Sequence, residues 1–319
     1  MSVQIINEEE IRRCLNPTDL IDPVRAAFVA HSQGLSRSAI SHLEPNGGEV
    51  HVKSGYAQGG QFYTIKVASG FPENQTRDLA VWDGMVAVFN ADTGALVAII
   101  EDHGLLTDWR TAAAGAIATH AFLGGELRQL GVVGSGLQAF WQPQAHRALM
   151  DFEILAVWGR DKQKAEHLCD RLRPLLAGVL VYAESSLEDL VRRSDAVITA
   201  TASHEPLIRA EWISPGKHIT AVGADTQMKQ ELESELLIRA STIAVDSMEA
   251  NHEYGEIGRA LREGLLPSER VKELGQMLAN PTLAPRAENA ITIAKLVGIG
   301  TQDLAAVTAL LAKKERPNG

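Results

Sequence analysis

The chain has 319 residues, of which 45% are hydrophobic and 22% charged, as in a globular protein with two domains or one large one. Its net charge of −10 and the lack of a basic stretch argue against nucleic acid or an anionic membrane as a partner. Two cysteines (Cys14 and Cys169) exclude a disulfide framework, ten histidines show no metal-ligand spacing, and without signal-peptide features or a long apolar run we expect a cytoplasmic protein.

The first third of the chain predicts helices and then strands. Residues 1–33 are predicted to be helical: Asn7 is suited to cap a helix over residues 8–15, and apolar periodicity predicts another over residues 19–33. Strands are predicted where apolar and polar side chains alternate or flank a turn, at residues 51–56, 63–67, 85–89 and 95–100. The turn is residues 90–94 (Asn-Ala-Asp-Thr-Gly). Thr107 is expected to cap an alanine-rich helix over residues 108–123, which can pack close to a neighbouring backbone.

From residue 129 onward, predicted strands alternate with predicted helices. The strands are residues 129–133, 154–158, 179–182, 196–199, 218–222, 242–245 and 291–297. The helices are residues 138–150, 162–172, 187–192, 232–240 and 302–311. This alternation predicts an α/β fold with a doubly wound parallel sheet of the Rossmann type. We expect an α+β domain over residues 1–117, a dinucleotide-binding domain over residues 118–300, and a C-terminal helix in residues 301–319 that packs back on the first domain.

The segment Leu-Gly-Val-Val-Gly-Ser-Gly-Leu-Gln-Ala, residues 130–139, has the strand–turn–helix pattern of a dinucleotide-binding turn. Gly134 permits a tight turn, Gly136 lets the backbone approach a pyrophosphate, and the helix that follows offers N–H groups to this anion. Ala139 replaces the third glycine and still allows close helix–strand packing. A glycine-rich turn without a ligand remains the alternative.

The next predicted strand ends in Val-Trp-Gly-Arg-Asp, residues 157–161. An acidic residue at this strand end reads the 2′-hydroxyl of NAD, whereas a nearby arginine suits the 2′-phosphate of NADP. Because Arg160 follows the strand at once, NADP is favoured over NAD. A solvated Arg160 beside a helix-capping Asp161 is the alternative.

Three further residues could carry chemistry. Lys66 lies in an apolar strand and Arg110 in the first turn of the alanine-rich helix, so both could bind an anionic substrate such as a carboxylate. For Lys66 and Arg110, spacing alone favours ion pairs with structural acids such as Glu101 or Asp108. Asp225 follows a strand at the edge where doubly wound sheets bind ligands, and it could transfer a proton to or from nitrogen, or serve only in a turn.

Several segments together resemble the ornithine cyclodeaminase/mu-crystallin family. They are Lys-Val-Ala-Ser-Gly-Phe-Pro-Glu-Asn (66–74), Leu-Thr-Asp-Trp-Arg-Thr-Ala-Ala-Ala-Gly-Ala (106–116), the glycine turn, Val-Gly-Ala-Asp-Thr-Gln-Met-Lys-Gln-Glu-Leu (222–232) and Val-Gly-Ile-Gly-Thr-Gln-Asp-Leu (297–304). They occur in the family's order and extend over most of the chain. The Arg-Thr-Ala-Ala-Ala-Gly block is more specific than the glycine turn.

The resemblance implies a homodimer that binds NAD(H) or NADP(H) and an amino or imino acid, with residues 1–117 as its substrate-binding and dimerisation domain. It implies that Lys66 and Arg110 face the substrate carboxylate, that Asp225 exchanges a proton with the substrate nitrogen, and that Lys66 takes part in catalysis. The remaining expected site residues are Val297 beside the substrate and Arg110, Thr111, Gly134, Gly136, Leu137, Gln138, Thr201 and Lys229 beside the cofactor.

Two departures from ornithine cyclodeaminases bear on the substrate. Residues 36–42 lack the Pro-x-Arg segment of those enzymes, and Lys53 stands near where they have an acid suited to the distal amine. A cation there repels a second ammonium group, so a substrate without a distal cation fits better. We therefore expect reduction of a cyclic or linear imino acid, such as Δ1-pyrroline-2-carboxylate. The alternatives are an ornithine cyclodeaminase that releases ammonia and a non-catalytic binder, which would be expected to have lost Lys66, Arg110 or Asp225.

Overall fold

The computed structural model describes residues 2–125, 127–283 and 289–315. The chain divides into two compact units, Met1–Arg110 with Ile299–Gly319, and Thr111–Gly298. The division falls inside helix α3 (Leu105–Leu123), seven residues before the boundary expected at residue 117. No described helix has the length and apolar character needed to cross a bilayer.

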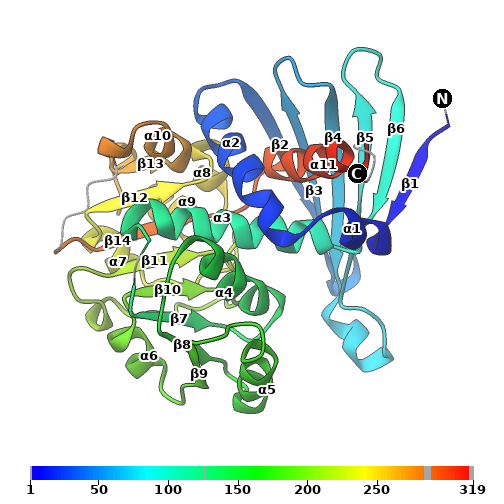
Figure 1. The fold of residues 1–319 in the computed structure, drawn as a ribbon. Helices are drawn as coiled ribbons and strands as arrows, with labels where there is room; N and C mark the ends of the chain where they lie inside the picture. Colours follow the sequence, from blue (N-terminus) through cyan, green and yellow to red (C-terminus); the bar gives the residue numbers. More distant parts are fainter. Residues whose placement is uncertain (1, 126, 284–288, 316–319) are drawn as a thin grey trace. The chain divides into compact units, whose positions relative to one another are not determined.

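A six-stranded sheet forms the first unit, with the strand order β1-β6-β5-β4-β3-β2 (Figure 1). Its strands are β1 (Gln4–Asn7), β2 (Ser36–Leu43), β3 (Glu49–Ala57), β4 (Phe62–Gly70), β5 (Trp82–Asn90) and β6 (Leu96–Glu101). Its helices, besides the start of α3, are α1 (Glu8–Cys14), α2 (Ile21–Ser32) and α11 (Gly300–Glu315). Neighbouring strands are antiparallel, except for β1, which runs parallel to β6.

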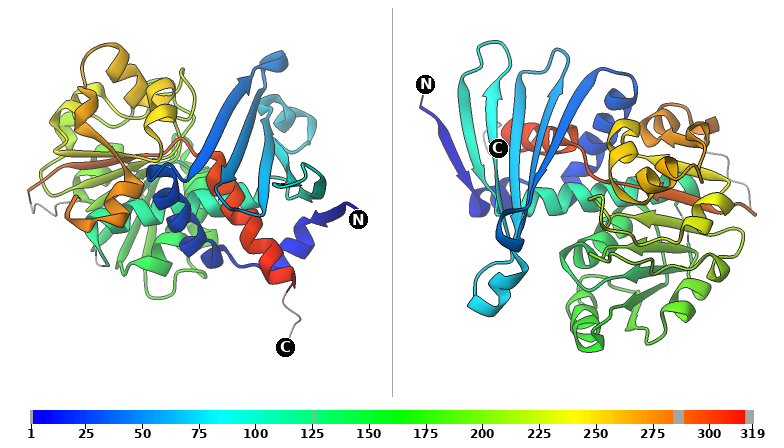
Figure 2. Two further views of the ribbon diagram at one scale, coloured as in Figure 1. Left: turned by 90° about the horizontal axis from the view of Figure 1, so that it is seen from above. Right: turned by 180° about the vertical axis from the view of Figure 1, so that it is seen from behind.

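Helix α11 packs on one face of this sheet, as the views of Figure 2 show. Its start lies directly on the backbone of β3, because a Cβ added to Gly55 would come within 2.2 Å of the carbonyl oxygen of Gly300. The Gly300 N–H donates to the Ser38 hydroxyl at 2.8 Å. The C-terminal helix expected from the sequence is therefore present, and its first turn is fixed over the buried side chains of β3 and β4.

Local signals in the first unit are confirmed at two places. The Asn7 side chain caps α1 by accepting a hydrogen bond from the Glu10 N–H. In the predicted turn, the Asn90 side chain accepts from the backbone of Asp92 and Thr93, and Gly94 has a positive φ of 70°.

Two predictions for the first unit are wrong. Gln4–Asn7 is a strand rather than part of a helical segment, because it pairs with the distant strand β6. Helix α3 begins at Leu105, so Thr107 is not its cap. The carboxylate of Asp102 instead accepts a hydrogen bond from the Leu106 N–H at 2.9 Å, and Thr107 is free to contact Lys66.

The second unit has the predicted Rossmann-type parallel sheet of eight strands, in the order β13-β12-β14-β11-β10-β7-β8-β9. They are β7 (Gln129–Val133), β8 (Ile154–Trp158), β9 (Leu180–Ala183), β10 (Ala196–Thr199), β11 (His218–Ala221), β12 (Thr242–Val245), β13 (Val271–Glu273) and β14 (Thr292–Lys295). Its helices after α3 are α4 (Leu137–Leu149), α5 (Lys162–Leu172), α6 (Leu187–Arg193), α7 (Ser234–Arg239), α8 (Met248–Glu253), α9 (Gly255–Arg262) and α10 (Leu274–Ala279). Strand β13 is not among the strands predicted from the sequence, and residues 284–288 lie outside the described residues.

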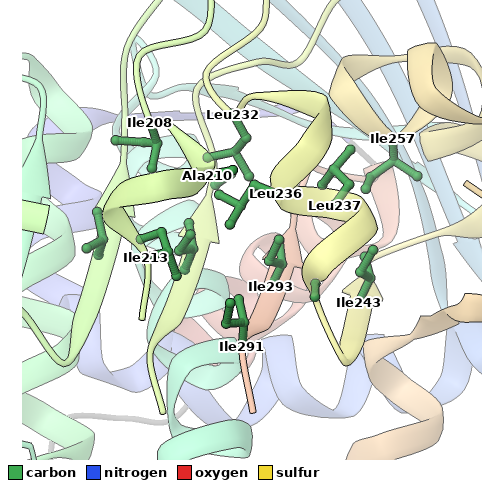
Figure 3. Packing of buried hydrophobic residues seen from close by; sticks show 14 of the residues in the cluster. Ile208, Ala210, Ile213, Leu232, Leu236, Leu237, Ile243, Ile257, Ile291 and Ile293 are labelled. Carbon is green, nitrogen blue, oxygen red and sulfur yellow. The ribbon is translucent and has the colours of Figure 1, made fainter. Parts of the chain in front are cut away.

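The strand order reverses at β7, since β8 and β9 lie on one side of it and β10 and β11 on the other. Ligands of doubly wound sheets bind at the carboxyl edge of such a reversal. One core beneath this edge is an apolar cluster that joins β11, β12 and β14 to helices α7 and α9 (Figure 3). Ile243, Ile293 and Leu237 in this cluster are fully buried, and their packing fixes the strands that carry the edge.

A buried chain of hydrogen bonds also crosses the second unit. It runs through Thr292, His218, Thr220, Thr119 and His146 to the carbonyl oxygen of Gln142. Because a carbonyl only accepts, Nδ1 of His146 carries the proton in this bond, and its Nε2 then accepts from Thr119. Burial lowers the pKa of His146 to about 4, and burial together with the charge of His146 lowers the pKa of His218 to about 3. Both rings are therefore neutral at pH 7.

Candidate active site

The glycine turn in the second unit has the geometry that its sequence requires. Gly134 has a positive φ of 135°, and a Cβ there would come within 2.5 Å of the Ala200 carbonyl oxygen, at the end of β10. A Cβ added to Gly136 would meet nothing within 4 Å, so its backbone borders open space, and helix α4 begins at the next residue, Leu137. Turn, open space and helix start together can accept the pyrophosphate of a dinucleotide.

The strand end beside this turn carries several polar side chains. Arg160 is exposed, and Asp161 caps α5 by accepting a hydrogen bond from the Lys164 N–H. A cavity of about 350 Å³ lies here, lined by Ser135, Asp161, Gln163, Lys164, His167, Leu168 and Arg171. Its lining has one lysine (Lys164) and one arginine (Arg171) but only one carboxylate (Asp161), so its net charge is positive. Arg160 is not among its lining residues.

The loops after β10 and β11 bring three more predicted residues, Thr201, Asp225 and Lys229, to the same edge of the sheet. Both the N–H and the hydroxyl of Thr201 donate to the Glu231 carboxylate, at 2.7 and 2.8 Å. The Asp225 side chain is 30% exposed, and its Oδ1 lies 3.0 Å from the ammonium nitrogen of Lys229. Asp225 is thus open to a ligand while it contacts a cation.

Three further predicted residues of the second unit lie in packed surroundings. The side-chain amide of Gln142 on α4 donates both to the carbonyl oxygen of Thr111 and to the side chain of Gln138. Thr111 and Gln138 are therefore linked through Gln142. Val297 is buried just after β14, and the following Gly298 N–H donates to the Asp246 carboxylate at 2.6 Å. Residue Asp246 therefore fixes the segment that carries Val297.

The first unit holds a buried cluster of the two predicted cations, Lys66 and Arg110, around Asp303 of α11. The Lys66 ammonium lies 3.0 Å from both carboxylate oxygens, and Nε of Arg110 lies 2.8 Å from Oδ1. Nη1 of Arg110 donates to Gln302, and Lys66 also contacts the Thr107 hydroxyl at 3.2 Å. The acid that both cations contact is thus Asp303, rather than Glu101 or Asp108.

This cluster carries an excess of positive charge. Two cations share one carboxylate, while the nearby carboxyl of Asp102 has its pKa raised by burial. Lys53, also buried, lies directly opposite Lys66 in the register of β3 and β4. Burial, together with the charges of Arg110 and Lys53, lowers the pKa of Lys66 to about 7, although Asp303 opposes the shift. Burial alone would raise the pKa of Asp303, but the charges of Arg110 and Lys66 hold it below its usual range.

Chemically, the cluster fits the carboxylate of a small molecule. The two bonds of Arg110 to Gln302 and Asp303 use two of five guanidinium N–H donors, which leaves donors for another acceptor. A substrate carboxylate would also neutralise the excess charge and restore the proton affinity of Lys66.

Sequence reasoning missed Asp303 and Glu231 as members of these arrangements. Both lie inside segments that carry the family resemblance, yet neither spacing nor composition marks them as partners. Asp303 is 237 residues from Lys66, and Glu231 is 30 residues from Thr201. Among the described residues, no group of three or more His, Cys, Asp or Glu side chains is arranged to hold a metal ion.

Comparison with known proteins gives one matching family. The sequence model of the ornithine cyclodeaminase/mu-crystallin family matches residues 2–316. An uncharacterised cyclodeaminase of Sinorhizobium fredii is 31% identical over 98% of this chain and 96% of its own length. Other matching proteins bear the names iminosuccinate reductase, ketimine reductase mu-crystallin and Δ1-pyrroline-2-carboxylate reductase.

Solved structures resemble the whole chain. A Δ1-pyrroline-2-carboxylate reductase of Thermococcus litoralis, in complex with NADH and L-proline, has a TM-score of 0.91 at 24% identity and covers 98% of this chain and 97% of its own. An archaeal alanine dehydrogenase, a dimer with bound NAD, has a TM-score of 0.89 at 26% identity and covers 98% and 96%. These likenesses agree with the Rossmann-type fold.

Proposed function

Because the chain belongs to the ornithine cyclodeaminase/mu-crystallin family, whose members are NAD(P)-dependent reductases, dehydrogenases or cyclodeaminases, we propose that it reduces an imino acid to the amino acid. The substrate is a cyclic or linear imine such as Δ1-pyrroline-2-carboxylate. The observation that carries this proposal is the buried cluster of Lys66 and Arg110 around Asp303, with its excess positive charge.

Each group has a defined part in the proposed reaction. The reduced cofactor, when bound, supplies a hydride to the carbon of the C=N bond. Lys66 and Arg110 hold the substrate carboxylate and fix which face of the imine is presented. Asp225 holds or delivers the proton at the nitrogen, so that hydride and proton together convert C=N to CH–NH. Lys229, 3.0 Å from Asp225, can return a proton to that carboxylate.

We propose NADP as the preferred cofactor, with NAD as the alternative. Two features support NADP: the exposed Arg160 after β8, and the cavity beside Ser135 with Lys164 and Arg171 in its lining. A relative with bound NAD and the carboxylate of Asp161 in the cavity support the alternative. Replacing Lys164 with Ala should weaken NADPH binding and leave NADH binding nearly unchanged.

Ornithine cyclodeamination is the competing reaction within the same family. It requires a second ammonium group on the substrate, and the buried Lys53 opposite Lys66 disfavours a further cation there. A non-catalytic binder would need neither Asp225 nor a cofactor turn. The presence of both favours an enzyme.

We propose that the protein is a homodimer that pairs through the face of the first-unit sheet turned away from α11. Apolar side chains occupy this face, namely Ile5, Val52, Tyr56, Tyr63, Ile65, Val67, Met85, Ala87, Phe89 and Ile99. Ile5 is 61% exposed and Met85 39%, which is unusual for a continuous apolar surface unless a partner covers it. Light scattering of a Met85→Lys variant should show loss of the dimer.

The first test of the function follows absorbance at 340 nm with NADPH or NADH and Δ1-pyrroline-2-carboxylate. We expect consumption that depends on the imine and is abolished by Lys66→Met. The control Lys217→Met removes a half-buried lysine that binds the carbonyl oxygens of Arg192 and Ser194, and it should retain turnover. Ammonia release from ornithine, without imine-dependent consumption, would refute the reductase and identify a cyclodeaminase.

A further inference from the structure

The carboxylate of Glu231 lies fully buried at the carboxyl edge of the second-unit sheet and accepts four hydrogen bonds. Its Oε1 accepts from the N–H and the hydroxyl of Thr201, at 2.7 and 2.8 Å. Its Oε2 accepts from the Thr199 hydroxyl and the Gly223 N–H, both at 2.8 Å. The backbone N–H groups of Thr201 and Gly223 can only donate, and one of them faces each carboxylate oxygen, so the arrangement favours an ionised carboxylate.

These bonds join two loops that follow neighbouring strands. Thr199 ends β10 and Thr201 lies two residues further on, whereas Gly223 follows β11 and precedes Asp225 by two residues. The loops meet with no spare room, because a Cβ on Gly223 would come within 2.1 Å of the Thr201 carbonyl oxygen and 2.5 Å of Oε1 of Glu231. The position of each loop therefore depends on the other and on this carboxylate.

A second buried group fixes Glu231 itself. The backbone N–H of Glu231 donates to Oε1 of Glu256 on α9 at 3.0 Å. Oε2 of Glu256 in turn lies 3.3 Å from the Lys295 ammonium on β14. Both of these side chains are at most 1% exposed. Burial, together with the negative charge of Glu256, raises the pKa of Glu231 above its usual range, although the charge of Lys295 and the bonds from Thr199 and Thr201 oppose that rise.

We propose that Glu231 is a positioning residue, which sets the Thr201 loop and the Asp225 loop in register for the cofactor and the proton transfer. Its effect on turnover rests on the function proposed above, but its effect on the two loops does not. A charged acceptor of four donors is stronger than neutral hydrogen bonds, and displacement of a reacting group by about 1 Å can cost about 100-fold in rate.

The substitution Glu231→Gln tests this with little change of volume. Each carboxylate oxygen accepts one backbone N–H, from Thr201 on one side and Gly223 on the other. Whichever way the amide lies, its NH₂ group faces a backbone donor that cannot become an acceptor. One loop must therefore move. Glu231→Asp is a second test, because its shorter side chain keeps the charge but cannot reach both loops.

The matched control is Thr220→Val. Thr220 lies on β11, and its buried hydroxyl bonds to Thr119 and His218 without contacting Glu231. It should lower the melting temperature about as much as Glu231→Gln. Because it leaves both loops in place, its cofactor affinity and kcat should stay within about twofold of the wild type.

We expect Glu231→Gln to weaken NADPH binding at least tenfold, measured by calorimetry without substrate, and to lower kcat by 10- to 100-fold. The KM for the imine should change less than threefold, since Lys66 and Arg110 belong to the other unit. Cofactor affinity and kcat within twofold of the wild type would overturn the proposal, as would equal losses in Thr220→Val. If the wild type does not reduce imines, the proposed function fails, and the calorimetric comparison still decides the role of Glu231.

Discussion

The buried Lys66 predicts that affinity for a carboxylate falls as pH rises through 7. In the free protein, burial and the charges of Arg110 and Lys53 lower the pKa of Lys66 to about 7. Near that pH, a large share of the Lys66 side chains are therefore neutral amines. A bound carboxylate favours the charged form and raises this pKa again. Binding is therefore strongest below pH 7, and it weakens above pH 7 because the lysine must take up a proton.

The size of the effect follows from the pKa of the bound state. An opposite charge within ~4–6 Å raises such a pKa by about 1–3 units, so Kd should rise about 10- to 1,000-fold between pH 7 and the upper pKa, or about 1.4–4 kcal/mol. Pyrrole-2-carboxylate is a suitable probe, because it resembles the cyclic imine but is not expected to be reduced by hydride. Calorimetry from pH 6 to pH 10, with cofactor present, measures its Kd.

Two variants separate Lys66 from other titrating groups. Lys66→Met should bind the probe weakly with no dependence on pH near 7, and Lys66→Arg should keep the charge and move the loss of affinity above pH 10. A wild-type Kd that stays constant from pH 6 to pH 9 would refute the reasoning, because Lys66 would then either not titrate there or not contact the ligand.

Three further predictions concern single residues. Asp225→Asn should lower kcat about 100- to 10,000-fold, as expected for loss of a general acid–base, while calorimetry shows unchanged cofactor affinity; unchanged turnover would remove Asp225 from the mechanism. Lys53→Met should improve binding of ornithine more than binding of the imine, by roughly 2 kcal/mol for the loss of one nearby like charge, and equal changes for both ligands would argue against its role in selectivity. His146 takes up its proton more readily when unfolded (pKa 6.5) than when folded (about 4), so its contribution to stability is complete above pH 6.5 and is lost as pH falls toward 4, by about 3 kcal/mol in urea titrations. His146→Gln should reduce this acid sensitivity.

The sequence predicts elements well where the signal is local. The glycine turn between β7 and α4 needs only neighbouring residues to specify it, as does the Asn90 turn, and both are confirmed. The strand β1 has no such signal. Its four residues gain their structure by pairing with β6, about 90 residues away, and a short stretch next to a helix gives no sign of that partner.

Helix α3 shows why the start of an element is harder to predict than its existence. Its alanine-rich stretch predicts the helix, but Thr107 and Asp102 are both suitable caps by residue type. Asp102 takes the role because β6 ends one residue before it, and the tight turn through His103 and Gly104, both with positive φ, brings its carboxylate to the Leu106 N–H. Thr107 is then placed inside the helix, next to Lys66.

The two candidate binding regions depend on acids that the sequence does not single out among its 40 aspartate and glutamate residues. Asp303 fixes two cations that come from β4 and α3, and Glu231 fixes two loops that follow β10 and β11. In each case the carboxylate belongs to a third segment, and only the fold brings the three together. A single chain read in order shows the charges but not the partners.

Burial of these acids and of Lys66 costs free energy that a packed apolar core would not, because each charge loses its water and must find partners inside the protein. This loss of stability is expected to persist only where the charges have a role that apolar side chains cannot fill. For Lys66 and Arg110 we propose that this is the recognition of an anion, with Asp303 keeping the two cations in place when no anion is bound. Glu231 meets no ligand in this scheme, and its two carboxylate oxygens instead accept the backbone N–H groups of two separate loops. We infer that position, rather than stability, is what both acids provide, and that Lys66→Met should raise the melting temperature while it weakens carboxylate binding.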